Sequence, residues 1–243
     1  MKLAHDRGGE GPRLLVLLHG LGATRNVWRG LIAEGRWQGR WIAPDLRGHG
    51  DSPHGASYAL ADHAGDVAEL VDGADVTVLG HSMGGAVALE LASGGYGFVP
   101  ARVFGLGIKL AWTADELAGM AKMAASKHRL FATRDEAIAR HLRVAGLSGL
   151  VPHEDGARGV TRTDEGWRLA QDPAVATVGA PRAAELLAAA RAPVHLARGA
   201  GDTMVTRQQL LAHDAGAADL PGGHNAMVEH PAAVWDWVEA HCG

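Results

Sequence analysis

The sequence predicts an α/β fold, in which helices flank a mostly parallel central sheet. Three observations predict it. Short apolar runs are typical of strands that are buried on both faces, as a parallel sheet requires. Amphipathic helical patterns alternate with these runs, which is typical of right-handed crossovers between parallel strands. The 243-residue chain is also 47% hydrophobic, which is enough to bury a sizeable core.

The elements are expected to alternate along most of the chain. Strands are predicted at residues 14–19, 41–44, 76–80, 103–108 and 194–197. Helices are predicted at residues 26–33, 60–71, 84–92, 206–213 and 226–240. The first dozen residues leave room for a short antiparallel strand at the sheet edge.

One stretch interrupts this alternation. After the strand at 103–108, about 80 residues contain no convincing buried strand. Two amphipathic helices, at 113–126 and 134–146, are followed by a Gly-rich polar stretch, and a helix opening on Pro181 then returns to the sheet. Such an insertion lies at the carboxyl edge of the sheet, where ligands bind in open α/β folds. We therefore expect a core of residues 1–111 and 179–243 and a helical lid of residues 112–178.

Composition excludes several classes of function. The net charge is −4 and no Lys/Arg cluster occurs, so we expect no nucleic-acid partner. No apolar run approaches the about 20 residues of a membrane helix, and the polar start does not resemble a signal peptide. The 14 histidines lack metal-binding spacings, so we expect no metal and no other cofactor. The single Cys242 fits a reducing, cytoplasmic location, and the oligomeric state, monomer or homodimer, is left open.

A Gly-x-Ser-x-Gly pattern stands where a predicted strand meets a predicted helix. It runs Gly80-His81-Ser82-Met83-Gly84. A serine at such a corner is held in strained backbone geometry with its hydroxyl exposed, and the glycines let neighbouring backbone approach. The alternative is an ordinary Gly-rich turn with Ser82 as a helix N-cap. The strand before and the helix after the pattern favour a nucleophile.

A candidate acid and a candidate base follow in chain order. A serine hydroxyl needs a base to take its proton, and the base needs a partner to orient it. Asp202 follows a predicted strand, and His224 precedes the last helix, each in a Gly-rich turn at the sheet edge that carries Ser82. The alternatives are a turn carboxylate and a loop histidine, and Asp115 is a second candidate for the acid.

The same edge offers donors for a developing negative charge. An attacked carbonyl oxygen becomes an anion, which backbone N–H groups stabilise by about 3 kcal/mol per donor. His19-Gly20 end the first predicted strand and lead into a glycine-containing turn. We predict that the N–H groups of Leu21 and Met83 form this oxyanion hole.

As a set, these motifs resemble the α/β-hydrolase fold in its lid-bearing, Ser-His-Asp form. The resemblance covers residue 12 to the end apart from the insertion, and rests on His19-Gly20, residues 45–52 (DLRGHGDS), residues 80–85 (GHSMGG), Asp202 and His224. It implies a helical lid inserted after the sixth strand. The amino-terminal antiparallel strands that are usual in the family look shortened in this chain. It further implies that Ser82 forms an acyl-enzyme, that His224 shuttles protons and Asp202 orients it, and that Leu21 and Met83 supply the oxyanion hole. The serine separates this chain from relatives with an aspartate there, such as haloalkane dehalogenases.

Large side chains near this edge predict an apolar pocket. The candidates are Trp28, Met83, Trp112, Met120, Met123, Leu130 and Met204, for each of which ordinary packing is the alternative. Lys109 ends a strand there, and we expect it to bind a substrate carboxylate or other anion. The alternative is a salt bridge to Asp115 or Glu116 at the lid hinge. Arg47 and His49 are expected to fix the loop at 45–52.

The sequence therefore predicts a cofactor-independent serine hydrolase that acts on a small-molecule acyl substrate, cleaving a carboxylic ester, lactone or thioester. Two alternatives stay open: cleavage of a C–C bond on the same fold, and a receptor that binds a small molecule without turnover. Dinucleotide binding would use residues 20–25 (GLGATR) and Asp45, but Arg25 stands where that motif has its third glycine.

Overall fold

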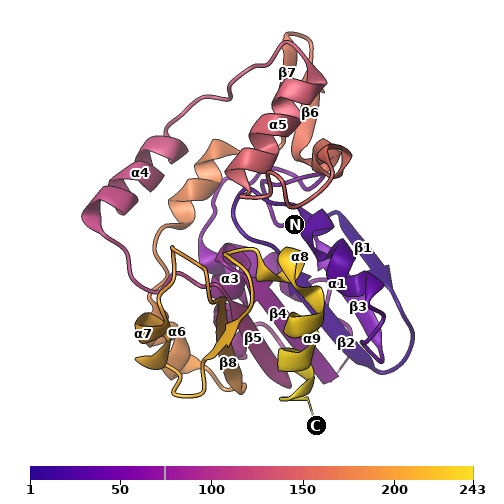
Figure 1. Ribbon diagram of the computed structural model, residues 1–243, viewed down its shortest axis with the longest axis vertical. Helices are drawn as coiled ribbons and strands as arrows, with labels where there is room; N and C mark the ends of the chain where they lie inside the picture. The colour runs from indigo at the N-terminus through magenta and orange to yellow at the C-terminus, as the bar shows by residue number, and fades with distance from the viewer. Residues whose placement is uncertain (74, 243) are drawn as a thin grey trace.

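The structure, a computed structural model, describes residues 1–73 and 75–242. Its main sheet has seven strands in the order β1-β3-β2-β4-β5-β8-β9, with helices on both faces (Figure 1). Only β1 runs antiparallel to its neighbour, β3; the other strand pairs of this sheet are parallel. The predicted mostly parallel α/β sheet is confirmed.

The strands of this sheet are short and mostly buried. Their bounds are β1 (His5–Gly8), β2 (Arg13–Leu18), β3 (Arg40–Pro44), β4 (Asp75–His81), β5 (Arg102–Leu106), β8 (Val194–Gly199) and β9 (Ala218–Leu220). β2 to β5 and β8 match the five predicted strands, and β1 is the edge strand for which the first dozen residues left room. β9 was not predicted, because three residues carry too little periodicity to be recognised.

Helices cover both faces of the sheet. They are η1 (Arg25–Trp28), α1 (Arg29–Ala33), α2 (Leu60–Ala68), α3 (Met83–Ala92), α6 (Ala183–Ala189), α7 (Arg207–Leu211), α8 (Ala226–Glu229) and α9 (Pro231–Glu239). The helix predicted at 226–240 is broken into α8 and α9 at His230, because Pro231 disfavours helical backbone at the residue before it. Successive residues of β4 pack in opposite layers: Val78 lies with α3, and Leu79 lies with Trp235 of α9.

Residues 112–178, the inserted segment, separate β5 from α6 and β8. The segment contains α4 (Ala114–Ala124), α5 (Arg134–Val144), the 3-10 turns η2 (His153–Gly159) and η3 (Pro173–Val178), and a hairpin of β6 (Val160–Thr163) and β7 (Gly166–Leu169). Both predicted helices are found, and each begins with a Thr-x-x-Glu capping box. The hairpin was not predicted, because its strands are only half-buried and polar. The segment is therefore not helical throughout.

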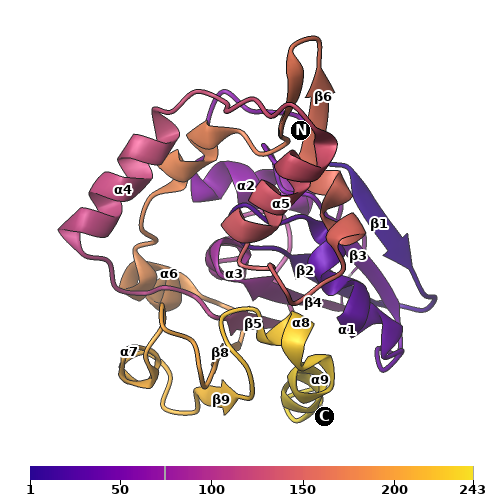
Figure 2. The same cartoon turned by 45° about the horizontal axis from the view of Figure 1, so that its top comes forward.

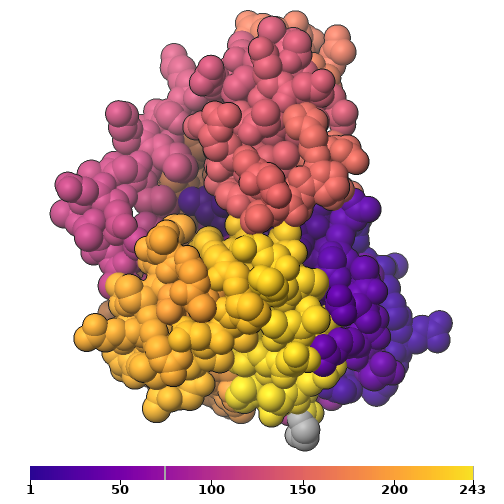
Figure 3. Space-filling view, in the orientation of Figure 1, coloured from indigo at the N-terminus to yellow at the C-terminus, as the bar shows by residue number. Residues whose placement is uncertain are grey.

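The inserted segment stands over the carboxyl ends of the parallel strands (Figures 1 and 2). In the space-filling view it forms the upper part of the molecule, above the carboxyl-terminal helices (Figure 3). It follows β5, which is the fifth strand of this chain and not the sixth, because a single antiparallel strand precedes β2. Within the described residues, no helix combines the length and the apolar character that crossing a bilayer requires.

Candidate active site

Ser82 occupies a strained corner between β4 and α3. Its φ of 51° and ψ of −116° make it the single non-glycine residue with a positive φ among residues 1–73 and 75–242. Such a conformation costs about 1–3 kcal/mol, so the surrounding backbone must enforce it. A Cβ on Gly80 would lie 2.2 Å from the Gly84 carbonyl oxygen, and one on Gly84 would lie 2.3 Å from that of Leu18. The two glycines are therefore required for the close backbone packing that holds Ser82 in this strained conformation.

Asp202 and His224 meet at the same edge of the sheet. Asp202 follows β8 and its side chain is fully buried, and Nδ1 of His224 lies 2.8 Å from its Oδ2. Because a carboxylate can only accept, Nδ1 carries the proton and Nε2 is left as an acceptor. Burial alone would raise the pKa of Asp202, but hydrogen bonds from His224 and from the Met204 N–H hold it below its usual value. Asp202 therefore stays ionised and orients the imidazole.

His81, the residue before the serine, links the corner to the His224 loop. Its Nε2 donates to the main-chain carbonyl of His224 at 2.8 Å, and the two rings lie 4.7 Å apart. Burial lowers the pKa of His81 to about 3, so the ring is neutral. The sequence analysis gave His81 no role. Ser82 and His224 line the same cavity, but no hydrogen bond between Ser82 Oγ and His224 is found within the described residues, so this last link stays a prediction.

The loop that carries Leu21 is fixed from below by two buried histidines. His49 Nε2 accepts from the Gly22 N–H at 3.1 Å. His19 Nδ1 donates to the Gly20 carbonyl at 2.8 Å, while its Nε2 accepts from the Leu46 N–H at 2.9 Å. Burial lowers the pKa of His19 to about 4 and that of His49 well below its ordinary value, so both rings are neutral acceptors.

Leu21 and Met83, the predicted oxyanion-hole residues, both line the cavity. In the part of the chain that the structure describes, neither N–H donates to a protein acceptor. Met83 opens α3, whose first N–H groups have no intrahelical partner. Two backbone donors therefore remain available beside Ser82.

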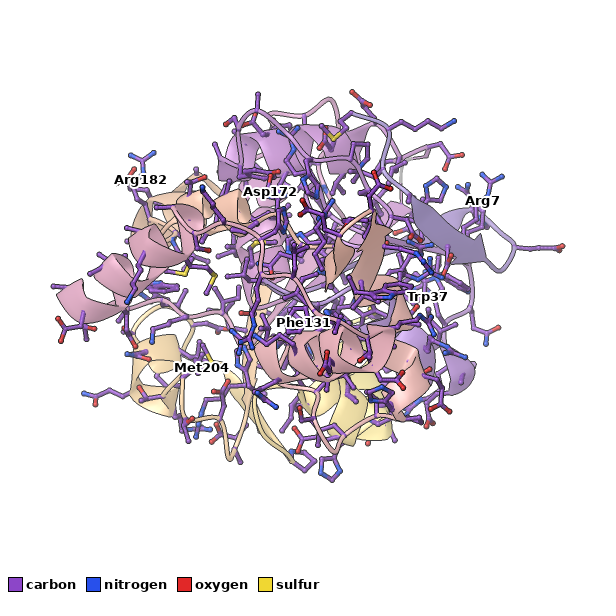
Figure 4. All side chains as sticks on the ribbon, turned by 90° about the horizontal axis from the view of Figure 1, so that it is seen from above. Arg7, Trp37, Phe131, Asp172, Arg182 and Met204 are labelled. Carbon is purple, nitrogen blue, oxygen red and sulfur yellow. The ribbon has the colours of Figure 1, made fainter. Side chains whose placement is uncertain are left out.

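The cavity measures about 320 Å³ and lies between the core and the inserted segment. Five of the eight predicted pocket residues line it, namely Met83, Lys109, Trp112, Met120 and Met204. Figure 4, viewed from above, places Met204 on the side of α7. Several lining residues were not predicted, because no motif marks them. They lie at or beyond the end of α5 or follow His224, and they are Val144, Ala145, Gly146, Leu150, Val178, Asn225 and Glu229.

Three predicted pocket residues, Trp28, Met123 and Leu130, do not line this cavity. Trp28 is completely buried in the core layer that contains Leu31 and Trp235. Met123 lies about 4.5 Å further along α4 than Met120, one helical turn past the cavity, and lines a separate, smaller one. Leu130 is exposed in the loop between α4 and α5.

Lys109 lines the cavity but is already paired. Its Nζ donates to the carboxylate of Glu116 and lies 5.2 Å from the centre of the Trp112 ring. The hydrogen bond from Lys109 contributes most to lowering the pKa of Glu116 below its usual value. The salt bridge expected as the alternative is therefore present, and a substrate anion would have to compete with it.

The rival site residues have other surroundings. Asp45 is fully buried and accepts from the N–H groups of Arg25 and Asp51, so it is not free to bind a ribose. Asp115 is exposed in the first turn of α4 and does not line the cavity.

One group within the described residues has metal-ligand spacing, namely His54, His128 and Asp172. Its atoms already have partners in the protein. His54 bonds to the Ala170 carbonyl at 3.0 Å, and Tyr58 donates to Asp172 at 2.6 Å. The absence of a metal site stays a prediction.

Comparison with known proteins identifies the family. The sequence profile described as the alpha/beta hydrolase family matches residues 15–237. The chain belongs to this family. It is 42% identical over 89 residues to an uncharacterized protein of Mycobacterium tuberculosis, covering 35% of this chain and 26% of the other. It is 37% identical over 89 residues to lipase LipV of the same species, covering 35% and 34%. The matches thus span about a third or less of these relatives.

A solved structure of the same family fold covers nearly the whole chain. The crystal structure of E-2-(acetamidomethylene)succinate hydrolase superposes with a TM-score of 0.79 at 21% identity, covering 98% of this chain and 94% of the other. At that identity the likeness shows the fold alone.

Proposed function

We propose that this protein hydrolyses a carboxylic ester, or a related lactone or thioester, through an acyl intermediate on Ser82. One observation carries the proposal. The buried carboxylate of Asp202 holds the His224 ring at 2.8 Å in the tautomer that leaves Nε2 free, and this ring lines the cavity into which the strained Ser82 opens. A nucleophile, a proton acceptor and its orienting group therefore share one edge of the sheet.

The reaction proceeds in two displacements. Oγ of Ser82 attacks the carbonyl carbon while its proton passes to Nε2 of His224. The carbonyl π electrons move to oxygen, which accepts hydrogen bonds from Leu21 and Met83. The bond to the leaving oxygen or sulfur then breaks, and His224 returns the proton to that atom. Water attacks the acyl-serine by the same steps, releasing the acid and restoring Ser82.

The lining of the cavity favours a small, largely apolar acyl group. Apolar side chains supply most of the wall, among them Leu60, Ile108, Trp112, Met120 and Leu150. A volume of about 320 Å³ is at the small end of ligand sites. Each proton transfer is assigned to a residue of the chain, so the proposed reaction uses no cofactor.

The experiment combines turnover with covalent labelling. Wild type, Ser82→Ala and Ser148→Ala, a control at an exposed serine of the inserted segment, are assayed with p-nitrophenyl acetate and butyrate. We expect Ser82→Ala to lose at least about 10⁴-fold in kcat, with no loss in the control. A fluorophosphonate should add to the peptide that contains Ser82. Full activity of Ser82→Ala, or ligand binding without any turnover by wild type, would overturn the proposal.

A further inference from the structure

A second cavity of about 140 Å³ lies beside the first, within the inserted segment. It is formed by the end of α4, the loop to α5, α5 itself and β7. Val144, at the end of α5, lines both cavities, so the two adjoin at this residue. The second cavity is therefore a neighbouring site for a molecule that fills the first. Phe131, on the wall of this second cavity, lies near the middle of the molecule when it is viewed from above (Figure 4).

The second cavity is lined by cations and by no acidic residue. The cations are Lys127, Arg129 and Arg140, and no Asp or Glu lines the cavity. Among residues 1–73 and 75–242, none of these three cations has a carboxylate oxygen within 4 Å. The cation of the first cavity differs, because Lys109 is paired with Glu116. Unpaired cations around one concave site attract an anion more strongly than scattered surface charges do.

Part of the wall of the second cavity is apolar. Phe131, Val144 and Leu169 line it beside the polar Ser126, His128 and Gln171, and the Arg129 guanidinium stacks 5.1 Å from the centre of the Phe131 ring. Stacking leaves the edge of a guanidinium free, and this edge binds carboxylates and phosphates through two parallel hydrogen bonds. Cations beside an apolar patch suit an anionic group that ends an apolar chain.

We propose that this second cavity binds a carboxylate or phosphate at the far end of the substrate whose carbonyl reacts at Ser82. The proposal rests on the proposed function and narrows its substrate class to anionic acyl compounds. It moves the anion site that the sequence analysis placed at Lys109 to Lys127, Arg129 and Arg140.

The kinetic test uses two matched pairs of variants. Lys127→Ala is compared with Lys122→Ala, and Arg140→Ala with Arg143→Ala; each control removes the same charge from an exposed position of the inserted segment that does not line the cavity. The substrates are p-nitrophenyl monoesters of glutarate, adipate and suberate and the neutral esters of matching length. We expect wild type to favour the anionic ester at one length by about tenfold in kcat/KM. Lys127→Ala and Arg140→Ala should lose that preference while the controls keep it. A preference equal in all five proteins, or absent in wild type, would overturn the proposal.

A binding measurement separates this proposal from the proposed function. Calorimetry with suberate, hexyl phosphate and the neutral 1-hexanol measures the affinity of the cavity for each ligand without any need for turnover. Tighter binding of either anion by wild type than by Arg140→Ala, with Arg143→Ala like wild type, supports the anion site even if no ester is cleaved. The stronger of the two ligands distinguishes a carboxylate from a phosphate. Equal affinities of Arg140→Ala and Arg143→Ala for both anions would overturn it.

Discussion

The loops that carry the candidate catalytic residues and the inserted segment that covers them are held in different ways. Beneath the loops, His19, His49 and Asp45 are completely buried and hydrogen-bonded, and nine of the ten residues of α3 are buried. In α4 no residue is buried, although the helix contributes Met120 to the cavity. The groups proposed for the chemistry are thus fixed by buried polar contacts. α4, which forms part of the wall of the cavity, is held by contacts of residues that are not buried.

The two helices of the inserted segment differ in how far they are buried. One face of α5 is buried through Ala137, Ile138, His141 and Leu142, whereas α4 stands apart from α5 across the cavity (Figures 2 and 3). A region with few buried apolar contacts opens at lower free energy than the core. We therefore expect substitutions in the core loops to change rate or stability strongly, and those in α4 to change them weakly.

The largest expected effect is on turnover. Asp202→Asn keeps the shape of the side chain but removes the charge that fixes the His224 tautomer, so we expect kcat/KM to fall by about 10⁴-fold with little change in the thermal midpoint. Asp115→Asn, at the second candidate acid, should behave like wild type. Ester hydrolysis of both variants measures this, and comparable rates for the two would refute the assignment of the acid.

The next effect is on stability, and it tests directly whether the core loops and the inserted segment are held in different ways. Asp45→Ala removes the fully buried partner of the Arg25 guanidinium, which keeps only the half-exposed Asp6 and Asp51, and leaves the N–H groups of Arg25 and Asp51 without their acceptor. We expect a loss of about 3–5 kcal/mol in the free energy of unfolding. Glu116→Gln removes the exposed partner of Lys109 in the inserted segment and should leave the midpoint of urea unfolding unchanged. Equal shifts in the two variants would show that core and insertion are held alike.

How far the sequence predicts this fold depends on how much of each element is buried. Runs such as those of β2 and β4 are buried on both faces, and their apolar patterns located them to within two residues. β9 and the strands of the β6–β7 hairpin are only three or four residues long, and those of the hairpin are half-exposed, so no apolar periodicity marks them. β9 also pairs with β8, which lies about 20 residues earlier in the chain. The break between α8 and α9 did carry a local signal, Pro231, which the helical periodicity outweighed.

The site divides in the same way. The Gly-x-Ser-x-Gly corner predicted Ser82, and position after a strand predicted Asp202, because backbone geometry ties these residues to local sequence. Pocket residues depend on which face of a helix turns inward. The sequence marks Trp28 as large and apolar but does not show that it packs in the core layer of Leu31 and Trp235. The role of His81 depends on a carbonyl 143 residues away, which no local pattern reveals.

The third effect appears at low pH and concerns a histidine beneath the core loops. His63 of α2 is fully buried, both its ring nitrogens lack a partner within the described residues, and burial lowers its pKa to about 3. Between pH 6.5 and that value the unfolded chain binds a proton that the folded chain does not. The free energy of unfolding therefore falls by about 1.4 kcal/mol per pH unit from this residue as the pH is lowered.

His63→Leu should remove this contribution. Relative to wild type, the variant should gain about 2 kcal/mol on going from pH 7 to pH 5, as measured by urea unfolding at both values. His213→Leu, at an exposed histidine, is the control and should follow wild type at both pH values. Parallel pH profiles for wild type and His63→Leu would show that the ring is charged or solvated in the folded protein.

The smallest effect is on kcat/KM, and it concerns the hydrogen bonds that join the core to the inserted segment. Asn225 is buried beside His224, and its Nδ2 donates to the carbonyls of Ala145 and Gly146 at 3.3 and 3.1 Å, just after α5. Asn26 makes a similar link elsewhere: its Nδ2 donates to the Asp155 carbonyl at 3.0 Å, away from the cavity. The two asparagines therefore form a matched pair, since each ties the core to the inserted segment through a side-chain amide.

If the better-anchored side of the inserted segment helps to hold the His224 loop, only one of these links should affect turnover. Asn225→Ala should lower kcat/KM for a neutral p-nitrophenyl ester by about tenfold, because small displacements of a proton-transfer group are costly. Asn26→Ala should keep kcat/KM within about twofold, since its link is remote from the reacting atoms. Measuring unfolding for both variants removes stability as an explanation. A loss of activity that follows stability equally in the two variants would mean that the inserted segment acts only as a cover and does not position the histidine.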